Sequence, residues 1–207
     1  MLDDGFQHLA LHRDVDLLLI DASDPAGLEV LLPAGRLREP LAAASRASAL
    51  LLTRADVAAG PNTLLAPIRA ATGRDSRPIL IRFRPEAFVN MVTGGIEEVA
   101  SVSGRTAVTF SGIANAASFR TLLADQGVKI LDDLVFPDHH AYTAGDLNLI
   151  RDRAGRCGAD MIVTTEKDAV KVATLVSRTD RLWALRLRTE IMEGQERLEG
   201  LLLGEPV

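Results

Sequence analysis

The sequence predicts an α/β protein with a mainly parallel sheet. Short apolar runs of strand length occur at 16–21, 48–53 and 160–164. Continuous runs of this kind are typical of strands that are buried on both faces of a parallel sheet. Stretches of helical character separate them, and an alternating order of strand and helix is the pattern of α/β folds.

The composition is that of an ordinary globular protein with one large domain or two small ones. No stretch approaches the roughly 18 apolar residues that a membrane-spanning helix needs. The net charge of −5 argues against a nucleic-acid-binding protein with a broad basic surface. The single cysteine, Cys157, excludes an internal disulfide, and no signal peptide opens the chain. We therefore expect a protein that is cytoplasmic or lies on the cytoplasmic face of a membrane.

Two adjacent carboxylates and a glycine, Asp3, Asp4 and Gly5, open the chain. They suit phosphoryl transfer, because carboxylates hold Mg²⁺ and a residue without Cβ lets phosphate and metal come close. Asp-Gly is also among the commonest turn dipeptides, so these residues alone favour a plain turn.

The first strand is followed by a predicted loop over 22–32 and by a helix from about Pro40 to Arg46. Arg36 and Arg38 lie between Gly35 and Pro40 and are therefore expected on a loop. On composition alone, their charges indicate a solvated loop.

The second strand, 48–53, ends in Thr53-Arg54-Ala55-Asp56. This tail fits a base-reading motif, in which an aspartate accepts hydrogen bonds from a purine, and equally a strand end followed by a helix cap. A helix over 62–72 and a half-exposed strand over 79–84 follow.

From Pro85 to Gly104, between the two halves of the chain, the pattern of alternating strands and helices is weaker. Gly94-Gly95 predicts a turn between two short extended stretches. We expect residues 86–104 to form a two-stranded linker that joins a core domain, residues 1–85, to a smaller C-terminal α/β domain, residues 105–207.

The C-terminal half begins with a strand over 106–110 and a helix that ends near Gln126. Asn115 or Ser111 is the expected cap, and a helix N-terminus after a glycine equally suits an anion. Thr143 is expected to cap the next helix with Asp146 as its capping-box acid.

A pair of histidines, His139 and His140, lies between Asp138 and Tyr142. Adjacent residues do not share a face of a helix or strand, so this pair does not predict a shared metal. Its neighbours allow an imidazole to be oriented by hydrogen bonding. Beyond the strand at 160–164, a helix opens with Thr165 and includes Lys167, and a final strand covers 182–188.

The phosphate-binding loop G-x-x-x-x-G-K-[ST] is absent from these 207 residues. The three lysines, Lys129, Lys167 and Lys171, do not follow a glycine. The backbone amides and the lysine of that loop must come from one contiguous turn before a helix, so no other segment fits it.

Five blocks occur in order along the chain. They are Met1-Leu2-Asp3-Asp4-Gly5-Phe6-Gln7-His8, Leu31-Leu32-Pro33-Ala34-Gly35-Arg36-Leu37-Arg38-Glu39-Pro40, Phe110-Ser111-Gly112-Ile113-Ala114-Asn115, Phe136-Pro137-Asp138-His139-His140-Ala141-Tyr142 and Thr164-Thr165-Glu166-Lys167-Asp168-Ala169-Val170. Together they resemble the tetraacyldisaccharide 4'-kinase family of lipid A synthesis.

The resemblance implies an ATP-dependent kinase that uses Mg²⁺ and phosphorylates the 4' hydroxyl of a tetraacyldisaccharide 1-phosphate at the cytoplasmic face of the inner membrane. It implies a partial sheet of the P-loop NTPase type. The roles it implies are Mg²⁺ binding by Asp3 and Asp4, catalysis by Asp4 with His139 or His140, and substrate binding by Gln7, His8, Arg36, Arg38 and Lys167.

The family's phosphate-binding loop and its proposed acidic base precede the first matching block. We therefore expect an N-terminally truncated kinase that is inactive alone, with an unpaired sheet edge that favours self-association. The alternative is a non-catalytic module that binds the lipid or completes a split kinase. Nucleic acid is not an expected partner.

Overall fold

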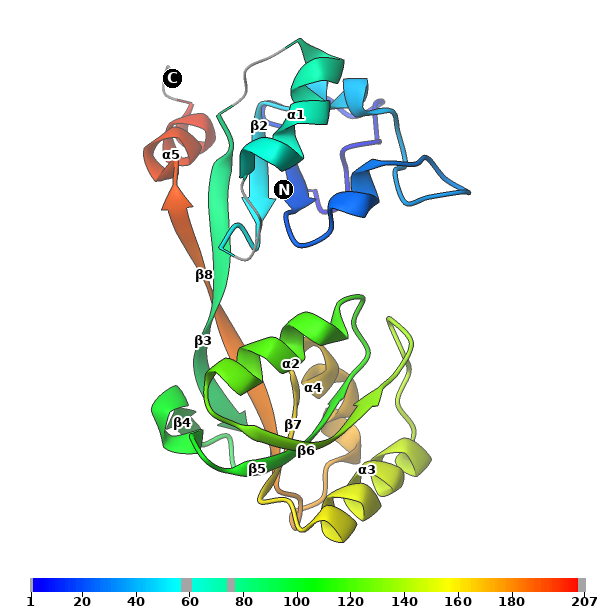
Figure 1. The fold of residues 1–207 in the computed structure, drawn as a ribbon, viewed down its shortest axis with the longest axis vertical. Coiled ribbons are helices and arrows are strands. Elements are labelled where there is room, and N and C mark those ends of the chain that lie inside the picture. The colour runs from blue at the N-terminus through cyan, green and yellow to red at the C-terminus, as the bar shows by residue number, and fades with distance from the viewer. Residues whose placement is uncertain (1, 57–60, 74–76, 205–207) are drawn as a thin grey trace. The chain divides into compact units, whose positions relative to one another are not determined.

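The computed structural model describes residues 2–56, 61–73 and 77–204, and the chain divides into two compact units. Unit 1 combines residues 1–83 with 189–207, and unit 2 comprises residues 84–188. The predicted α/β class is confirmed (Figure 1). The division differs from the expected one, because residues 86–104 lie within unit 2 and the final segment lies in unit 1.

The sheet of unit 1 is built on parallel pairs. Strand β1 (Leu17–Asp21) pairs with β2 (Ala49–Thr53), and β2 pairs with the start of β3 (Ile79–Asn90). The connections contain the short 3₁₀ helices η1 (Pro25–Leu28) and η2 (Leu41–Arg46), and helix α1 (Pro61–Thr72). The helix predicted at 40–46 is thus present in its tighter 3₁₀ form.

Both faces of β2 are covered, which explains its continuous apolar sequence. Leu50 and Leu52 pack on one face with Ile68 of α1. Leu51 packs on the other face with Leu198 of helix α5 (Gln195–Leu203). The sequence pattern predicts no element for the segment that contains α5.

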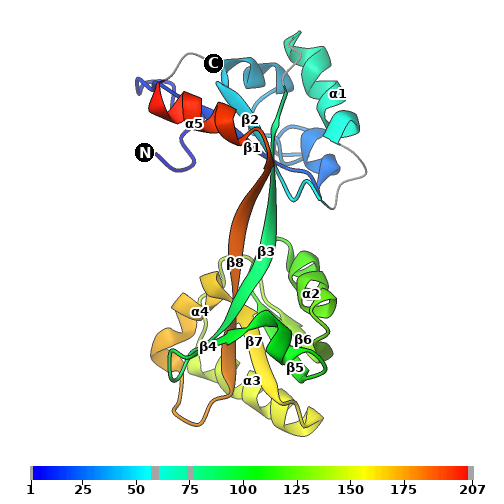
Figure 2. The ribbon, with the colours of Figure 1, turned by 90° about the vertical axis from the view of Figure 1, so that its left-hand side faces the viewer.

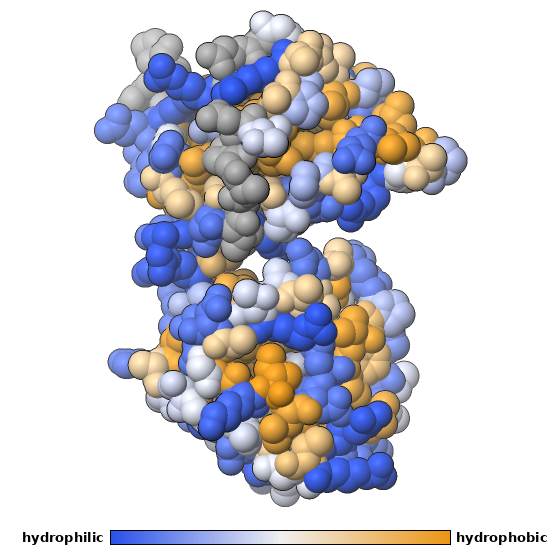
Figure 3. Space-filling view, in the orientation of Figure 1, coloured by the Kyte–Doolittle hydropathy of each residue, from blue (hydrophilic) through white to orange (hydrophobic). Residues whose placement is uncertain are grey.

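Strand β1 departs from the prediction of burial on both faces, because the Leu19 side chain is 61% exposed. Within the part of the chain that the structure describes, β1 ends the strand order and pairs only with β2. Leu17 packs against the core cluster that includes Leu198 of α5, whereas Leu19, two residues further along the same face, is not part of that cluster. Figure 3 shows apolar surface, in orange, on this unit.

Unit 2 contains four neighbouring strands in the order β8-β7-β5-β6, with parallel pairing throughout. These strands are β5 (Thr106–Ser111), β6 (Lys129–Val135), β7 (Met161–Thr165) and β8 (Leu182–Glu193). The boundary between the two units falls inside β3 and inside β8, and both strands are longer than predicted.

Helices cover both faces of this sheet (Figures 1 and 2). Helix α2 (Ala116–Asp125) packs on one face through Phe119 and Leu123. Helices α3 (Ala144–Cys157) and α4 (Glu166–Val172) contribute to the core on the other face, the latter followed by the short η4 (Ala173–Leu175).

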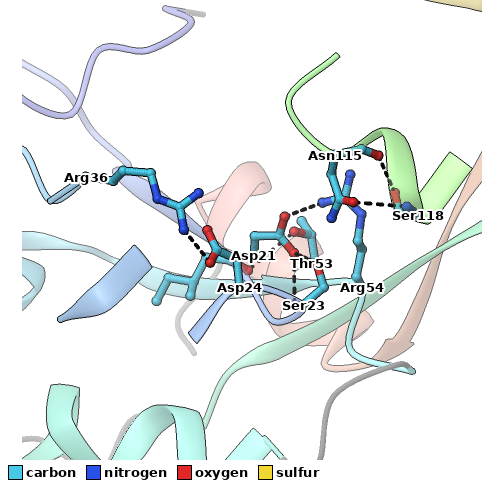
Figure 4. A network of polar contacts seen from close by, with 9 residues as sticks. Asp21, Ser23, Asp24, Arg36, Thr53, Arg54, Asn115 and Ser118 are labelled. Atoms are coloured by element: carbon cyan, nitrogen blue, oxygen red, sulfur yellow. Dashed lines mark hydrogen bonds and ion pairs between the residues drawn. The ribbon is translucent and has the colours of Figure 1, made fainter. Parts of the chain in front are cut away.

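The predicted caps are present. Asn115, and not Ser111, caps α2 by accepting a hydrogen bond from the amide of Ser118, as Figure 4 shows. Thr143 and Asp146 form the capping box of α3.

The segment predicted to be a two-stranded linker contains a short hairpin. The end of β3 pairs with β4 (Ile96–Glu98) in antiparallel register, and the Gly94-Gly95 turn joins them. Residues after β4 form the 3₁₀ helix η3 (Val99–Val102) instead of the expected extension. No helix among the described residues is long and apolar enough to cross a bilayer.

Candidate functional site

A cavity of about 260 Å³ lies in unit 1, beside the carboxyl end of β1. Its wall carries five charged side chains, from Asp21, Asp24, Arg36, Arg38 and Glu39. The apolar part of the lining includes Phe6, Leu18, Ile20, Leu28, Leu41 and Ile68. A cavity of this kind suits a ligand that has both apolar and polar parts.

The parallel register brings the first charged residues together. Asp21 and Thr53 are partners at the ends of β1 and β2, so Arg54, the next residue, lies beside Asp21. Arg54 Nη1 lies 2.5 Å from Asp21 Oδ2, and Asp21 Oδ1 accepts hydrogen bonds from the amide and hydroxyl of Ser23 (Figure 4). Every oxygen of this carboxylate is therefore engaged.

Arg36 is presented by a narrow turn. The amide of Leu32 donates to the carbonyl of Leu37 at 2.8 Å, and the amide of Leu37 donates to the carbonyl of Val30 at 3.1 Å. A Cβ at Gly35 would lie only 2.1 Å from the Val30 oxygen, so this turn requires glycine. Arg36 Nη2 contacts Asp24 Oδ1 at 2.5 Å (Figure 4).

The opening block lies at the same cavity. Phe6 packs against the core of unit 1 and Gln7 lines the cavity, while the exposed His8 is not part of its lining. Arg13 donates to the carbonyl oxygens of Gly5 and His8, which joins the block to the segment that precedes β1.

Asp4 is held by Arg38. Arg38 Nη1 lies 2.8 Å from Asp4 Oδ2 and 2.9 Å from Asp4 Oδ1. Asp4 itself has a left-handed backbone, with φ of 51°. Asp3 Oδ1 accepts a hydrogen bond from the Asp4 amide at 3.0 Å.

The donor set of Asp3 and Asp4 fits Mg²⁺, which proteins commonly bind through one or two carboxylates together with water and phosphate oxygens. Asp3 and Asp4 do not form a closed metal site made only of protein groups. The described part of the chain contains no group of three or more His, Cys, Asp or Glu side chains placed to hold a metal.

The predicted residues of unit 2 lie near one another on that unit. His140 Nε2 lies 3.2 Å from Asp146 Oδ2, and its ring stacks on Phe136 with centroids 4.7 Å apart. Tyr142 meets the same imidazole edge-on. Burial, followed by the nearby charge of Asp168, raises the pKa of Tyr142 above its ordinary value.

His139 is held differently from His140. Its side chain is 76% exposed, and its backbone is left-handed, with φ of 60°. Asp138 Oδ1 accepts a hydrogen bond from the His139 amide and also from Lys167 Nζ. Desolvation acts to raise the pKa of Asp138, but the hydrogen bond and charge of Lys167 outweigh it and lower the pKa.

Sequence reasoning missed several residues of these sites. Asp21 and Asp24 line the cavity, and the acid at the end of the first apolar run was the available signal. Arg54 was named only within the tail of the second strand, and it forms an ion pair with Asp21. Asp168 was named only as part of a motif. Its side chain is fully buried and accepts hydrogen bonds from Gly112 and Lys171.

Comparisons with known proteins give one consistent result. The family described as Tetraacyldisaccharide-1-P 4'-kinase (LpxK) matches residues 1–205. A tetraacyldisaccharide 4'-kinase of Anaeromyxobacter dehalogenans (strain 2CP-C) is 39% identical over 206 residues, which cover 98% of this chain and 54% of that protein. That of Syntrophobacter fumaroxidans (strain DSM 10017 / MPOB) is 40% identical over 181 residues, which cover 86% of this chain and 46% of that protein.

A crystal structure of LpxK from Aquifex aeolicus in complex with ATP is similar with a TM-score of 0.62 and 27% identity. The match covers 97% of this chain and 55% of that one. The chain thus spans about half the length of the relatives that it matches.

Proposed function

This chain belongs to the tetraacyldisaccharide-1-P 4'-kinase family, and we propose that it supplies the acceptor-binding and metal-binding part of an ATP-dependent kinase of lipid A biosynthesis. The acceptor is the 4' hydroxyl of a tetraacyldisaccharide 1-phosphate. For such a lipid acceptor, we propose that the protein acts from the membrane surface at the cytoplasmic face of the inner membrane.

The observation that carries this proposal is Arg36 at the wall of a largely apolar cavity. The Arg36 side chain is 66% exposed, and its guanidinium contacts only one oxygen of Asp24, so it retains donors for a phosphate. A planar guanidinium matches phosphate geometry with two parallel hydrogen bonds. A cavity of about 260 Å³ is too small for four acyl chains, so we assign it to the phosphorylated sugar.

Asp3 and Asp4 are proposed to hold Mg²⁺, which when bound neutralises charge on the phosphates of ATP. Arg38 already neutralises Asp4 in this structure. Gln7, at the cavity wall, supplies a neutral hydrogen-bonding group for the sugar.

His139 is the better candidate of the two histidines for a role at the transferred phosphate. Its imidazole is exposed, with Asp138 3.8 Å away. The imidazole of His140 instead contacts the rings of Phe136 and Tyr142 and the carboxylate of Asp146 within unit 2. We propose that Asp138 orients His139 and that Lys167 supports Asp138.

These 207 residues contain no phosphate-binding loop, and in phosphoryl transfer most of the rate comes from positioning and from stabilising charge on the phosphates. We therefore propose that the chain transfers no phosphoryl group alone and acts together with residues that carry that loop. Acceptor binding then belongs to this chain, whereas nucleotide binding requires the loop-bearing residues.

Calorimetry on the chain as it stands tests this separation. The ligand is tetraacyldisaccharide 1-phosphate in detergent micelles, and the disaccharide without its phosphate is the ligand control. Arg36→Gln is expected to weaken binding of the phosphorylated lipid about tenfold or more, while the exposed Arg178→Gln changes nothing. Equal binding by Arg36→Gln and the wild type would exclude Arg36 as the phosphate ligand. Tight binding of ATP with Mg²⁺, or ATP hydrolysis lost in Asp4→Asn, would contradict the assigned division of roles.

A further inference from the structure

The first turn of α4 contacts the histidine-bearing segment, residues 137–140, by two routes. The first route starts at Asp168. Its Oδ2 accepts hydrogen bonds from the Gly112 amide at 2.9 Å and from Thr165 Oγ1 at 2.9 Å. The carbonyl of Gly112 then accepts a hydrogen bond from the His139 amide at 3.2 Å. Asp168 is thus two hydrogen bonds away from the backbone of His139.

The second route starts at Lys167, the residue before Asp168. Lys167 Nζ lies 3.3 Å from Asp138 Oδ1, and this oxygen accepts a hydrogen bond from the same His139 amide at 2.9 Å. Both routes therefore meet at one N–H group. That group belongs to a non-glycine residue with φ of 60°, a conformation that needs support from its surroundings.

Gly112 is the point at which the segment is packed most closely. A Cβ there would lie 3.0 Å from Tyr142 Oη, 3.1 Å from the Pro137 oxygen and 3.3 Å from His140 Cβ. The segment therefore depends on both the space at Gly112 and the bond that Gly112 donates to Asp168. The Asp168 side chain has no exposed area, and its charge is balanced by Lys171 Nζ at 2.9 Å.

We infer that Asp168 is a positioning residue for His139, acting through Gly112, and that Lys167 supports the same backbone group through Asp138. The buried carboxylate of Asp168 is held in place, because its two oxygens accept hydrogen bonds from three parts of unit 2. These are Gly112 after β5, Thr165 at the end of β7, and Lys171 in α4. The role in phosphoryl transfer rests on the proposed function, whereas the positioning of His139 does not.

Nuclear magnetic resonance on the full chain tests the positioning directly. The ¹³Cα shift of His139 reports its left-handed φ, and the exchange rate of the Gly112 amide reports the bond to Asp168. In Asp168→Asn we expect the His139 shift to move toward the average of a mobile residue and Gly112 exchange to accelerate about tenfold. The amides of Leu147 and Ile150 in α3 are expected to keep their rates. Glu166→Gln, an exposed acid in the same helical turn, is the matched control and leaves all these signals in place.

A second variant addresses the case in which Asp168→Asn does not fold. Gly112→Ala changes no charge, yet it displaces residues 137–142 and is expected to shift His139 in the same way. The inference is wrong if His139 keeps its shift in both variants, or if every amide of unit 2 loses protection in step with it.

Phosphotransfer provides the readout that a purely structural role would not give. Measured with this chain together with residues that carry the phosphate-binding loop, Asp168→Asn is expected to lower kcat about 10- to 100-fold with the KM for the lipid unchanged, because Arg36 is untouched. A rise in KM alone would overturn the assignment of Asp168 to His139. If the wild type shows no 4'-kinase activity even together with the loop-bearing residues, the proposed function fails, while the resonance measurements still decide the positioning.

Discussion

Arg38 and Asp4, 34 residues apart in the chain, are joined by an ion pair in which one guanidinium nitrogen contacts both carboxylate oxygens. Both side chains are more than half exposed, at 56% and 69%. Exposed pairs of this kind contribute about 0.2–1 kcal/mol. The pair therefore matters less for stability than for the charge available at Asp4.

Removing the cation is expected to strengthen the binding of Mg²⁺. In Arg38→Gln, Asp4 no longer shares its oxygens with a positive charge, so the Mg²⁺ affinity of the chain should rise about two- to fivefold. Calorimetric titration with MgCl₂ measures this change, with Arg178→Gln as the control. Asp4→Asn is expected to abolish the binding. An affinity that falls in Arg38→Gln would exclude Asp4 as the shared ligand.

The pair between Arg151 and Asp180 makes the stability of unit 2 depend on pH. Arg151 Nη2 lies 2.7 Å from Asp180 Oδ2, and Nε lies 2.8 Å from Oδ1. The hydrogen bond from Arg151 is the largest effect on the pKa of Asp180 and lowers it. Desolvation acts in the opposite direction, and the hydrogen bond from the Ser177 amide lowers the pKa further. A carboxyl with a lowered pKa stabilises the fold above its unfolded pKa of about 3.9 and loses that contribution as the pH falls through the folded value.

Asp180→Asn is therefore expected to cost about 1–2 kcal/mol at pH 7, a value kept modest because Arg151 is partly exposed. The difference from the wild type should shrink as the pH is lowered from 4 to 2. Urea unfolding followed at several pH values measures it. The control is Asp152→Asn, which removes an exposed acid beside Arg151. A cost that stays constant from pH 7 to pH 2 would show that the charge of Asp180 is not its source.

A third prediction concerns the turn that presents Arg36. Gly35→Ala places a Cβ against the Val30 carbonyl and is expected to open the turn. Binding of the phosphorylated lipid should fall about tenfold, as for Arg36→Gln. Gly155→Ala is the control, since its Cβ meets no atom within 4 Å in α3 and should raise stability by about 0.5–1 kcal/mol. Normal lipid binding by Gly35→Ala would mean that the turn does not position Arg36.

Self-association is expected through the exposed strand β1. Leu19 presents an apolar side chain on a strand that pairs with β2 alone among the described residues. Edge strands of this kind pair with other chains unless charge prevents it. Leu19→Lys should lower the average mass measured by sedimentation at high protein concentration, whereas Leu149→Lys, on the exposed side of α3, should not. A wild-type chain that stays monomeric at all concentrations would contradict the prediction.

The regular elements were predictable where one local signal determines the structure. The β2 strand is a continuous apolar run because both of its faces are covered. Thr143 and Asp146 form a capping box because their spacing places each side chain on the other's backbone amide. Such signals act within a few residues, so the sequence shows them directly.

Other features depend on contacts between distant residues. The full lengths of β3 and β8 were not predictable, since each strand changes its neighbours along its length. Helix α5 was missed because its sequence is not strongly amphipathic, and it is placed by packing on Ile79 and Leu51. The choice between His139 and His140 needed the structure, because their difference in exposure arises from Phe136, Tyr142 and Asp146 around only one of them.

The division of the chain has a consequence for its synthesis on the ribosome. Unit 2 is a single continuous segment and is complete once Arg188 has emerged. Unit 1 is interrupted by it, and the core beneath β2 also requires Ile191, Leu198 and Leu201 from the last part of the chain. Residues 1–83 are made before unit 2 and residues 189–207 after it, so unit 2 is able to fold while the cavity-bearing unit still lacks part of its core.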